Sequence, residues 1–163
     1  MVERLIIGID PGLANTGYGI ISFYNNRFHH ITHGAITTEA SLSHGNRLLH
    51  IYNELTFLLK EFKPNEAGIE TLYFSKNVSS ALSVSEARGV SILALFSQNV
   101  TDLCEYAPNA IKKAVTGIAQ ANKEQVQEAT RILLGLSEWP RPNHAADALA
   151  AAIARANIGK GYV

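Results

Sequence analysis

The sequence predicts an α/β fold in which helices flank a mixed sheet of five strands. Residues 5–9 form a short, almost wholly aliphatic run, which is typical of a strand buried on both faces. Strands at 16–24 and 27–37 follow, and the Asn25-Asn26 connection is short enough to make them an antiparallel hairpin. A helical segment then precedes another short strand at 66–70, which can therefore lie parallel to the first strand.

The composition indicates one domain in the cytoplasm. The chain has 163 residues, 47% of them hydrophobic, which suits a single core over residues 1–157, with a frayed tail at 158–163. No apolar run could span a bilayer, and the N-terminus lacks the layout of a signal peptide. The single cysteine cannot form an internal disulfide, so we expect a cytoplasmic protein without a membrane partner.

The net charge of the chain, which is zero, argues against a nucleic-acid partner. Basic and acidic residues number 14 each, whereas nucleic-acid-binding proteins usually carry a basic surface. If a few of the acids hold cations, the remaining surface is effectively positive, so the distribution of charge matters more than the total.

Periodicity and helix breakers predict the other elements. Apolar residues recur at three- and four-residue steps from Leu48 to Phe62, which predicts a helix that begins near residues 43–47 and ends before Pro64. A final helix at 144–156 is rich in alanine, and Asn143 is its expected N-cap. Three further helices are predicted at 78–98, 108–115 and 123–134. A fifth strand is predicted at 101–106.

The hairpin carries three histidines that could suggest a metal site. Alternation along a strand places His29 and His33 on one face and His30 on the other. Neither a cysteine nor a nearby acid completes a tetrahedral set, so solvated histidines on an edge strand are the favoured interpretation.

Four side chains at element ends point to a common site. Asp10 directly follows the first strand, and Glu70 ends the parallel strand, so both acids should lie at one rim of the sheet, where open α/β sheets place their sites. His144 and Asp147 share one face of the first turn of the last helix. Three acids repel one another without a cation, and their oxygen ligands suit Mg²⁺, for which Mn²⁺ can substitute because His144 adds a nitrogen. Two such ions about 3.5–4 Å apart would support attack of water on a phosphodiester.

Each of these residues also has a plainer interpretation. An Asp before Pro-Gly commonly hydrogen-bonds to its own turn, as Asp10 could. Asp147 could be an acid that the helix dipole favours in a first turn, and His144 an exposed imidazole at the end of a loop.

Several aromatic and basic residues are candidates for contact with nucleic acid. Tyr73 and Phe74 lie beside Lys76 and Asn77, and such a combination could stack bases and hold phosphates, although either ring could instead fill the core. Further candidate phosphate contacts are lysines of the predicted helices, with ordinary solvated surface as the alternative for each: Lys112, Lys113 and Lys123.

The motifs together resemble the RuvC family of bacterial crossover junction endodeoxyribonucleases over nearly the whole chain. Each motif is short, but their shared order makes the match specific. They are GIDPG with TGYG (Gly8 to Gly12, Thr16 to Gly19), IE (Ile69-Glu70), KN (Lys76-Asn77), SAL and ARGV (Ser80 to Leu82, Ala87 to Val90), EYA (Glu105 to Ala107), KxQV (Lys123 to Val126) and AADALA (Ala145 to Ala150).

The resemblance implies a ribonuclease H-like fold and a homodimer that nicks two opposed strands of a four-way Holliday junction during recombination and repair. It implies that Asp10, Glu70 and Asp147 are catalytic acids that bind two Mg²⁺ per subunit, with His144 at a fourth position where many relatives have Asp. It also implies that RuvA and RuvB, the branch-migration proteins, are partners.

The resemblance also assigns the nucleic-acid contacts. Tyr73 falls where the family places an aromatic that stacks at the junction centre. Lys112 and Lys123 match lysines implicated in DNA contact, and Arg88 of the ARGV motif is a further candidate.

Three other classes compete with this prediction. Actin-like ATPases and sugar kinases open with a similar glycine-rich strand and turn, but they need a second lobe for which the chain has no room. A non-catalytic module that binds junctions is a second alternative, although an acid cluster without a function only destabilises a protein. A related nuclease acting on RNA or on another branched DNA is the third.

Overall fold

The sheet has the mixed topology that the sequence predicts. The computed structural model describes residues 2–71 and 78–158. Within these ranges the strand order is β3-β2-β1-β4-β5, with antiparallel pairing from β1 to β3 and parallel pairing from β1 through β4 to β5. The strands are β1 (Arg4–Asp10), β2 (Asn15–Tyr24), β3 (Arg27–Thr37), β4 (Glu66–Glu70) and β5 (Asp102–Tyr106).

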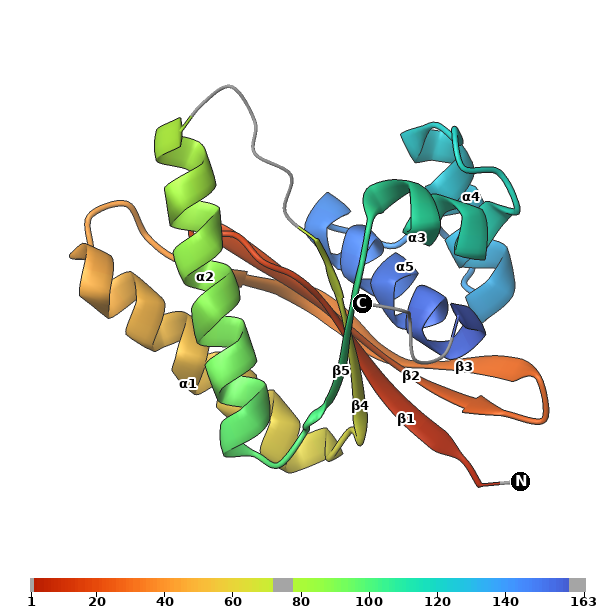
Figure 1. Cartoon of the computed structure of the whole chain (residues 1–163), viewed down its shortest axis with the longest axis horizontal. Helices are drawn as coiled ribbons and strands as arrows, with labels where there is room; N and C mark the ends of the chain where they lie inside the picture. Colours follow the sequence, from red (N-terminus) through yellow and green to blue (C-terminus); the bar gives the residue numbers. More distant parts are fainter. Residues whose placement is uncertain (1, 72–77, 159–163) are drawn as a thin grey trace.

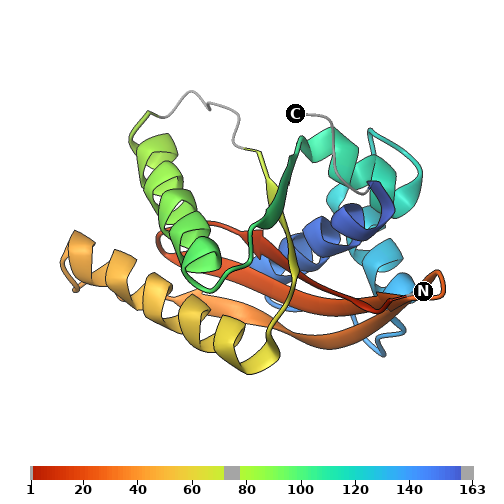
Figure 2. The same cartoon turned by 60° about the horizontal axis from the view of Figure 1, so that its bottom comes forward.

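Helices cover both faces of this sheet. Two of them, α1 (His44–Phe62) and α2 (Val78–Ser97), pack together on one face. The others lie on the opposite face (Figures 1 and 2): α3 (Pro108–Thr116), α4 (Lys123–Leu134) and α5 (Asn143–Ile158). Every predicted helix and strand is present, and the bounds differ only at their ends. None of the helices in the described ranges is long and apolar enough to cross a membrane.

The last helix departs from the prediction at both ends. It begins at Asn143 itself, and the Asn143 Oδ1 accepts a hydrogen bond of 3.1 Å from the Gln127 amide, so the expected N-cap role is wrong. The helix also continues to Ile158, one residue past the predicted end of the domain. Residues 159–163, the predicted tail, lie outside the described residues, and the extent of the domain stays a prediction.

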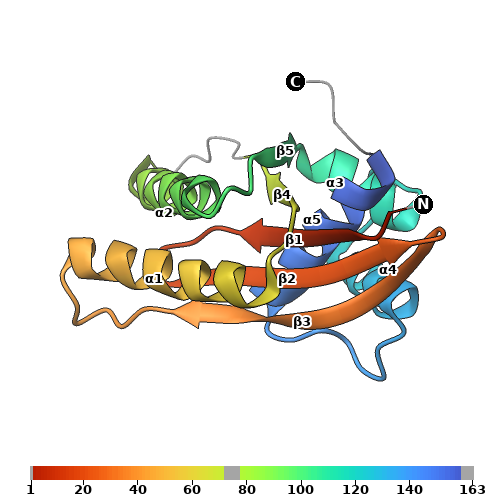
Figure 3. The same ribbon diagram turned by 90° about the horizontal axis from the view of Figure 1, so that it is seen from below.

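A row of glycines lets α5 lie directly on the sheet. Gly8 of β1 pairs with Gly19 of β2 on one side and with Gly68 of β4 on the other, and Figure 3 shows the long strands side by side. A β-carbon on Gly8 would lie 1.8 Å from the Ala148 carbonyl oxygen, a distance that no real packing allows. Only glycine fits such a close approach of two backbones. The alanines of α5 and the glycines of the strands therefore pack directly against each other.

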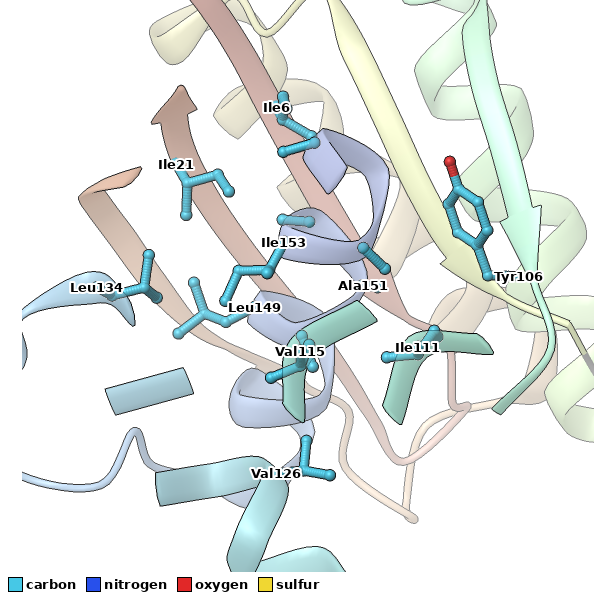
Figure 4. Packing of buried hydrophobic residues seen from close by; sticks show 14 of the residues in the cluster. Ile6, Ile21, Tyr106, Ile111, Val115, Val126, Leu134, Leu149, Ala151 and Ile153 are labelled. Carbon is cyan, nitrogen blue, oxygen red and sulfur yellow. The ribbon is translucent and has the colours of Figure 1, made fainter. Parts of the chain in front are cut away.

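The core is divided by the sheet into two clusters. On the α5 side, Leu149 and Ile153 pack against Ile6 and Ile21 of the strands, as Figure 4 shows. All four of these side chains are fully buried, and burial of an aliphatic chain of this size contributes about 1.5–3 kcal/mol. Because α5 is tied to the sheet by these contacts, the side chains of its first turn are held in a fixed position beside the ends of β1 and β4.

A bulge in β3 overturns the predicted placement of the histidines. The register shifts between Ile20, which pairs with Thr32, and Ile21, which pairs with His30, so one extra residue lies between them in β3. His30 and His33 consequently lie on the same face, with the His30 Nε2 2.7 Å from the His33 Nδ1. Burial lowers the pKa of both imidazoles, and both are partly shielded rather than fully solvated.

Candidate active site

Asp10 and His144 meet at the end of β1. The His144 Nδ1 lies 2.7 Å from the Asp10 Oδ2, so the imidazole N–H can donate a hydrogen bond to the carboxylate. The turn after Asp10 is closed by another residue, because the Thr16 hydroxyl donates to the Gly12 carbonyl oxygen at 2.7 Å. Asp10 therefore does not have the purely local role of a turn residue.

The approach of α5 to β2 makes this meeting possible. Asp10 is paired in register with Gly17, and a β-carbon on Gly17 would lie 2.0 Å from the His144 carbonyl oxygen. Gly8 of the GIDPG motif and Gly17 and Gly19 of the TGYG motif thus have a structural reason, which is to let α5 lie close enough to β1 and β2 to bring its first turn against the end of β1. Glycine inside a strand is a sign of close approach, and this sign was available in the sequence.

The two glutamates of β4 have opposite environments. Glu66, at the start of the strand, is paired with Arg4 at 2.6 Å and with Arg155 at 2.9 Å. Glu70, at the end of the strand, has no ion-pair partner within 4.0 Å among the described residues. An acid that is half-buried without a paired cation is typical of a functional position rather than a structural one.

Asp147 completes the acid cluster from the first turns of α5. Its Oδ2 lies 3.3 Å from the Lys123 Nζ at the start of α4. Two adjoining hollows share Glu70, Pro108 and Asp147 in their walls, with volumes of about 430 and 330 Å³. The first also contains Asp10 and His144, and the second contains Lys112 and Lys123. All four predicted site residues therefore line one continuous cleft.

Burial and mutual repulsion act on the acids of this cleft. Burial raises the pKa of the Asp10 carboxyl, the hydrogen bond with His144 partly offsets this, and the charge of Asp147 adds to it. Burial also raises the pKa of Glu70, and the charges of Asp10 and Asp147 raise it further against the opposing effect of the lysines. Raised pKa values in neighbouring acids indicate that their cluster lacks compensating positive charge.

The donor chemistry of the cluster fits a hard divalent cation. Three carboxylates and one imidazole at a single rim offer the oxygen-rich set that Mg²⁺ or Mn²⁺ prefers. In the described ranges, no three Asp, Glu, His or Cys side chains are arranged to hold a metal ion as they stand. Asp10 is bonded to His144 and Asp147 to Lys123 through Oδ2 alone, so each acid can offer its other carboxylate oxygen to a cation without giving up this partner.

The predicted nucleic-acid contacts have varied surroundings. Lys112 and Lys123 line the cleft, whereas Lys113 is exposed and does not line it. Arg88 forms an ion pair with Glu105 of β5. Four further candidates lie outside the described residues: Tyr73, Phe74, Lys76 and Asn77.

The cleft also has lining residues that the sequence did not single out. Pro108 at the start of α3 lines both hollows, and Thr71 and Val84 line the hollow beside Asp10. These residue types carry no chemical signal of their own. Only the parallel pairing of β4 with β5, which places the start of α3 next to Glu70, reveals their position.

The sheet has this mixed strand order, two of its parallel strands end in acids, and a third acid lies on the covering helix. Together these features define a nuclease domain with a ribonuclease H-like fold. Comparison with known proteins agrees with this class. The family model for the crossover junction endodeoxyribonuclease RuvC matches residues 6–155. The protein of that name from Treponema denticola is 65% identical over 154 residues, which cover 94% of this chain and 86% of the relative.

The chain belongs to the RuvC family of crossover junction endodeoxyribonucleases, which are metal-dependent nucleases. Among solved structures, Thermus thermophilus RuvC in complex with a Holliday junction substrate is similar, with a TM-score of 0.91 at 30% identity. That match covers 96% of this chain and 95% of the Thermus chain. The yeast mitochondrial resolvase Ydc2 shares the fold, with a TM-score of 0.65 at 14% identity.

Proposed function

We propose that this protein resolves four-way Holliday junctions by nicking two opposed DNA strands symmetrically during recombination and repair. The observation that carries the proposal is the convergence of Asp10, Glu70, His144 and Asp147 on one cleft, at the carboxyl ends of two parallel strands. The similar Thermus protein forms a complex with a Holliday junction substrate, which supports the choice of DNA substrate.

The chemistry assigned to the cleft is hydrolysis of a phosphodiester. Asp10, Glu70, Asp147 and His144 would hold the metal, which we propose to be two Mg²⁺ per subunit with Mn²⁺ as a substitute. The bound cations would supply the charge that activates the attacking water and stabilises the leaving oxygen. His144 orients the Asp10 carboxylate through their 2.7 Å contact, and Pro108 and Val84 line the same hollow.

Basic residues beside the acids would hold the DNA backbone. Lys112 and Lys123 line the hollow next to Glu70 and Asp147, so they can contact the phosphates that flank the scissile bond. We also assign DNA contact to Lys113 and Arg88 around the cleft, and to the aromatic and polar group formed by Tyr73, Phe74, Lys76 and Asn77. In this group Tyr73 would stack at the junction centre.

Symmetric nicking needs two active sites, which we attribute to a homodimer. The outer face of α2 carries Leu82 and Leu93, each 60% exposed, and Phe96, 49% exposed. Gly89 lies in the same stripe and would leave a β-carbon free of contacts within 4 Å, so a second backbone can come close there. The spacing of seven, four and three residues along this stripe is that of a helix–helix seam, which supports pairing of α2 with α2 of a second copy.

The remaining assignments follow from the proposed reaction. RuvA and RuvB, which move the branch point, would be partners, and the protein would act as a single nuclease domain in the cytoplasm, where the DNA lies. These assignments rest on family membership rather than on a contact in the structure.

The test compares the wild type with Asp10→Asn on a synthetic four-way junction. The variant should lose cleavage and keep junction binding in a gel-shift assay, because the change removes one charge from the cleft and leaves the fold intact. Glu61→Gln, an exposed acid on α1, is the matched control and should cut like the wild type. Cleavage by Asp10→Asn at the wild-type rate would contradict the proposed site. Binding of the junction by the wild type without any cleavage would instead leave a non-catalytic module.

A further inference from the structure

A second concave surface lies on the side of α4 away from the acid cleft. It is a groove between α3 and α4 with a volume of about 580 Å³. Lys123 and Val126 of α4 line the acid cleft, whereas the groove is formed by the other side of the same helix. Its lining includes Ile118, Glu124, Glu128, Ile132, Leu133 and Trp139.

Large apolar side chains lie open to solvent in this groove. Ile118 is 53% exposed and Ile132 is 61% exposed, from the loop after α3 and from α4. Trp139 is 37% exposed, and its Nε1 donates a hydrogen bond of 2.7 Å to the Glu128 Oε2. A contiguous apolar surface of this kind, with an indole already fixed in position, is typical of a site that binds another chain.

The charges on the groove select against nucleic acid. The only charged residues that line it, within the described ranges, are Glu124 and Glu128. Glu128 is held by hydrogen bonds from Arg131 and Trp139, and the Arg131 guanidinium at 2.7 Å balances its charge, whereas Glu124 has no cation within 4.0 Å among the described residues and leaves this side of the groove acidic. Phosphates would be repelled, whereas lysine or arginine side chains would be attracted.

We propose that the groove between α3 and α4 binds an amphipathic, basic helical segment of a protein partner. The apolar face of that helix would cover Ile118, Ile132 and Trp139, and a basic residue beside that face would reach Glu124. The stretch from Glu124 to Leu133 of α4 is about 14 Å long, which matches a partner helix of two to three turns. This surface is separate from the acid cleft, so a partner held here leaves the cleft free for DNA.

A synthetic peptide tests the proposal directly. The probe is a helix of about ten residues with leucines on one face and lysines beside them; a second peptide has glutamates in place of the lysines. Trp139 is the only tryptophan of the chain, so its fluorescence reports occupancy of the groove. The lysine peptide should shift this fluorescence and bind at least about tenfold more tightly than the glutamate peptide.

Variants separate the groove from non-specific association. Ile132→Glu should weaken binding of the lysine peptide at least about tenfold, while Phe57→Glu, a 63% exposed site on α1, should leave it unchanged. Both variants should still cut a four-way junction at the wild-type rate, which shows that they are folded. The proposal is overturned if Ile132→Glu binds the peptide normally, if the two peptides bind equally, or if neither binds.

Discussion

The close packing of α5 on β2 makes Gly17→Ala the sharpest test of how the site is assembled. The added β-carbon would lie 2.0 Å from the His144 carbonyl oxygen and 2.3 Å from the carbonyl carbon. Real β-carbons essentially never come within 3.0 Å of another heavy atom, so the start of α5 must move by about 1 Å. That movement carries His144 and Asp147 away from Asp10, whose present contact with His144 is 2.7 Å.

The magnitude follows from the size of this displacement. A shift of about 1 Å at a catalytic group can lower the rate about a hundredfold. The forced repacking should also lower the free energy of unfolding by about 1–3 kcal/mol. The rate of junction cleavage and a urea unfolding curve measure the two effects separately, and gel-shift binding shows that the variant remains folded.

Gly45→Ala provides the matched control for this experiment. Gly45 lies near the start of α1 with nothing within 4 Å of an added β-carbon. Alanine is favoured over glycine in a helix by up to about 1 kcal/mol, so this variant should be as stable as the wild type or more so and should cut normally. Normal cleavage and unchanged stability in Gly17→Ala would refute the argument that this glycine positions the first turn of α5.

Three further predictions test the acids and the dimer. The pKa of Glu70 is raised in the folded protein, so its ionised form lowers the stability once the pH exceeds this folded pKa. In EDTA, Glu70→Gln should therefore raise the free energy of unfolding at neutral pH, and this gain should vanish below pH 4.5, the ordinary pKa of the group. The same variant should lose cleavage. His144→Asp should still cut with Mg²⁺, because a carboxylate also binds this ion, whereas a folded, inactive variant would show that the imidazole has a role of its own. Leu93→Glu should sediment as a monomer and lose paired nicks, whereas Leu49→Glu, 54% exposed on α1, should remain dimeric; a dimeric Leu93→Glu protein would contradict the proposed interface.

Local patterns in the sequence predicted the framework of the site well. The apolar runs that end in Asp10 and Glu70 were sufficient to place both acids at one rim, because a helix between two strands permits parallel pairing. The spacing of His144 and Asp147 likewise predicted a shared face of one helical turn. These inferences succeed because strand and helix periodicity are local properties of the chain.

The features that the sequence did not predict depend on contacts between distant segments. The bulge that brings His30 to the same face as His33 depends on the pairing of β3 with β2. The bond between Asp10 and His144 joins residues 134 positions apart, and it requires the glycine row beneath α5. No motif marks the groove between α3 and α4, because the exposed Ile118 and Ile132 form one surface only when the loop after α3 lies beside α4.

The measurement that tests the central claim most directly is cleavage of a synthetic four-way junction with Mg²⁺, with Mn²⁺ and with EDTA. A linear duplex of the same sequence and an RNA–DNA hybrid serve as the competing substrates. We predict paired, symmetric nicks in the junction alone, with either metal, and no cleavage in EDTA. Cleavage of the hybrid in preference to the junction would contradict the account, because the acid cleft would then serve a nuclease that acts on RNA.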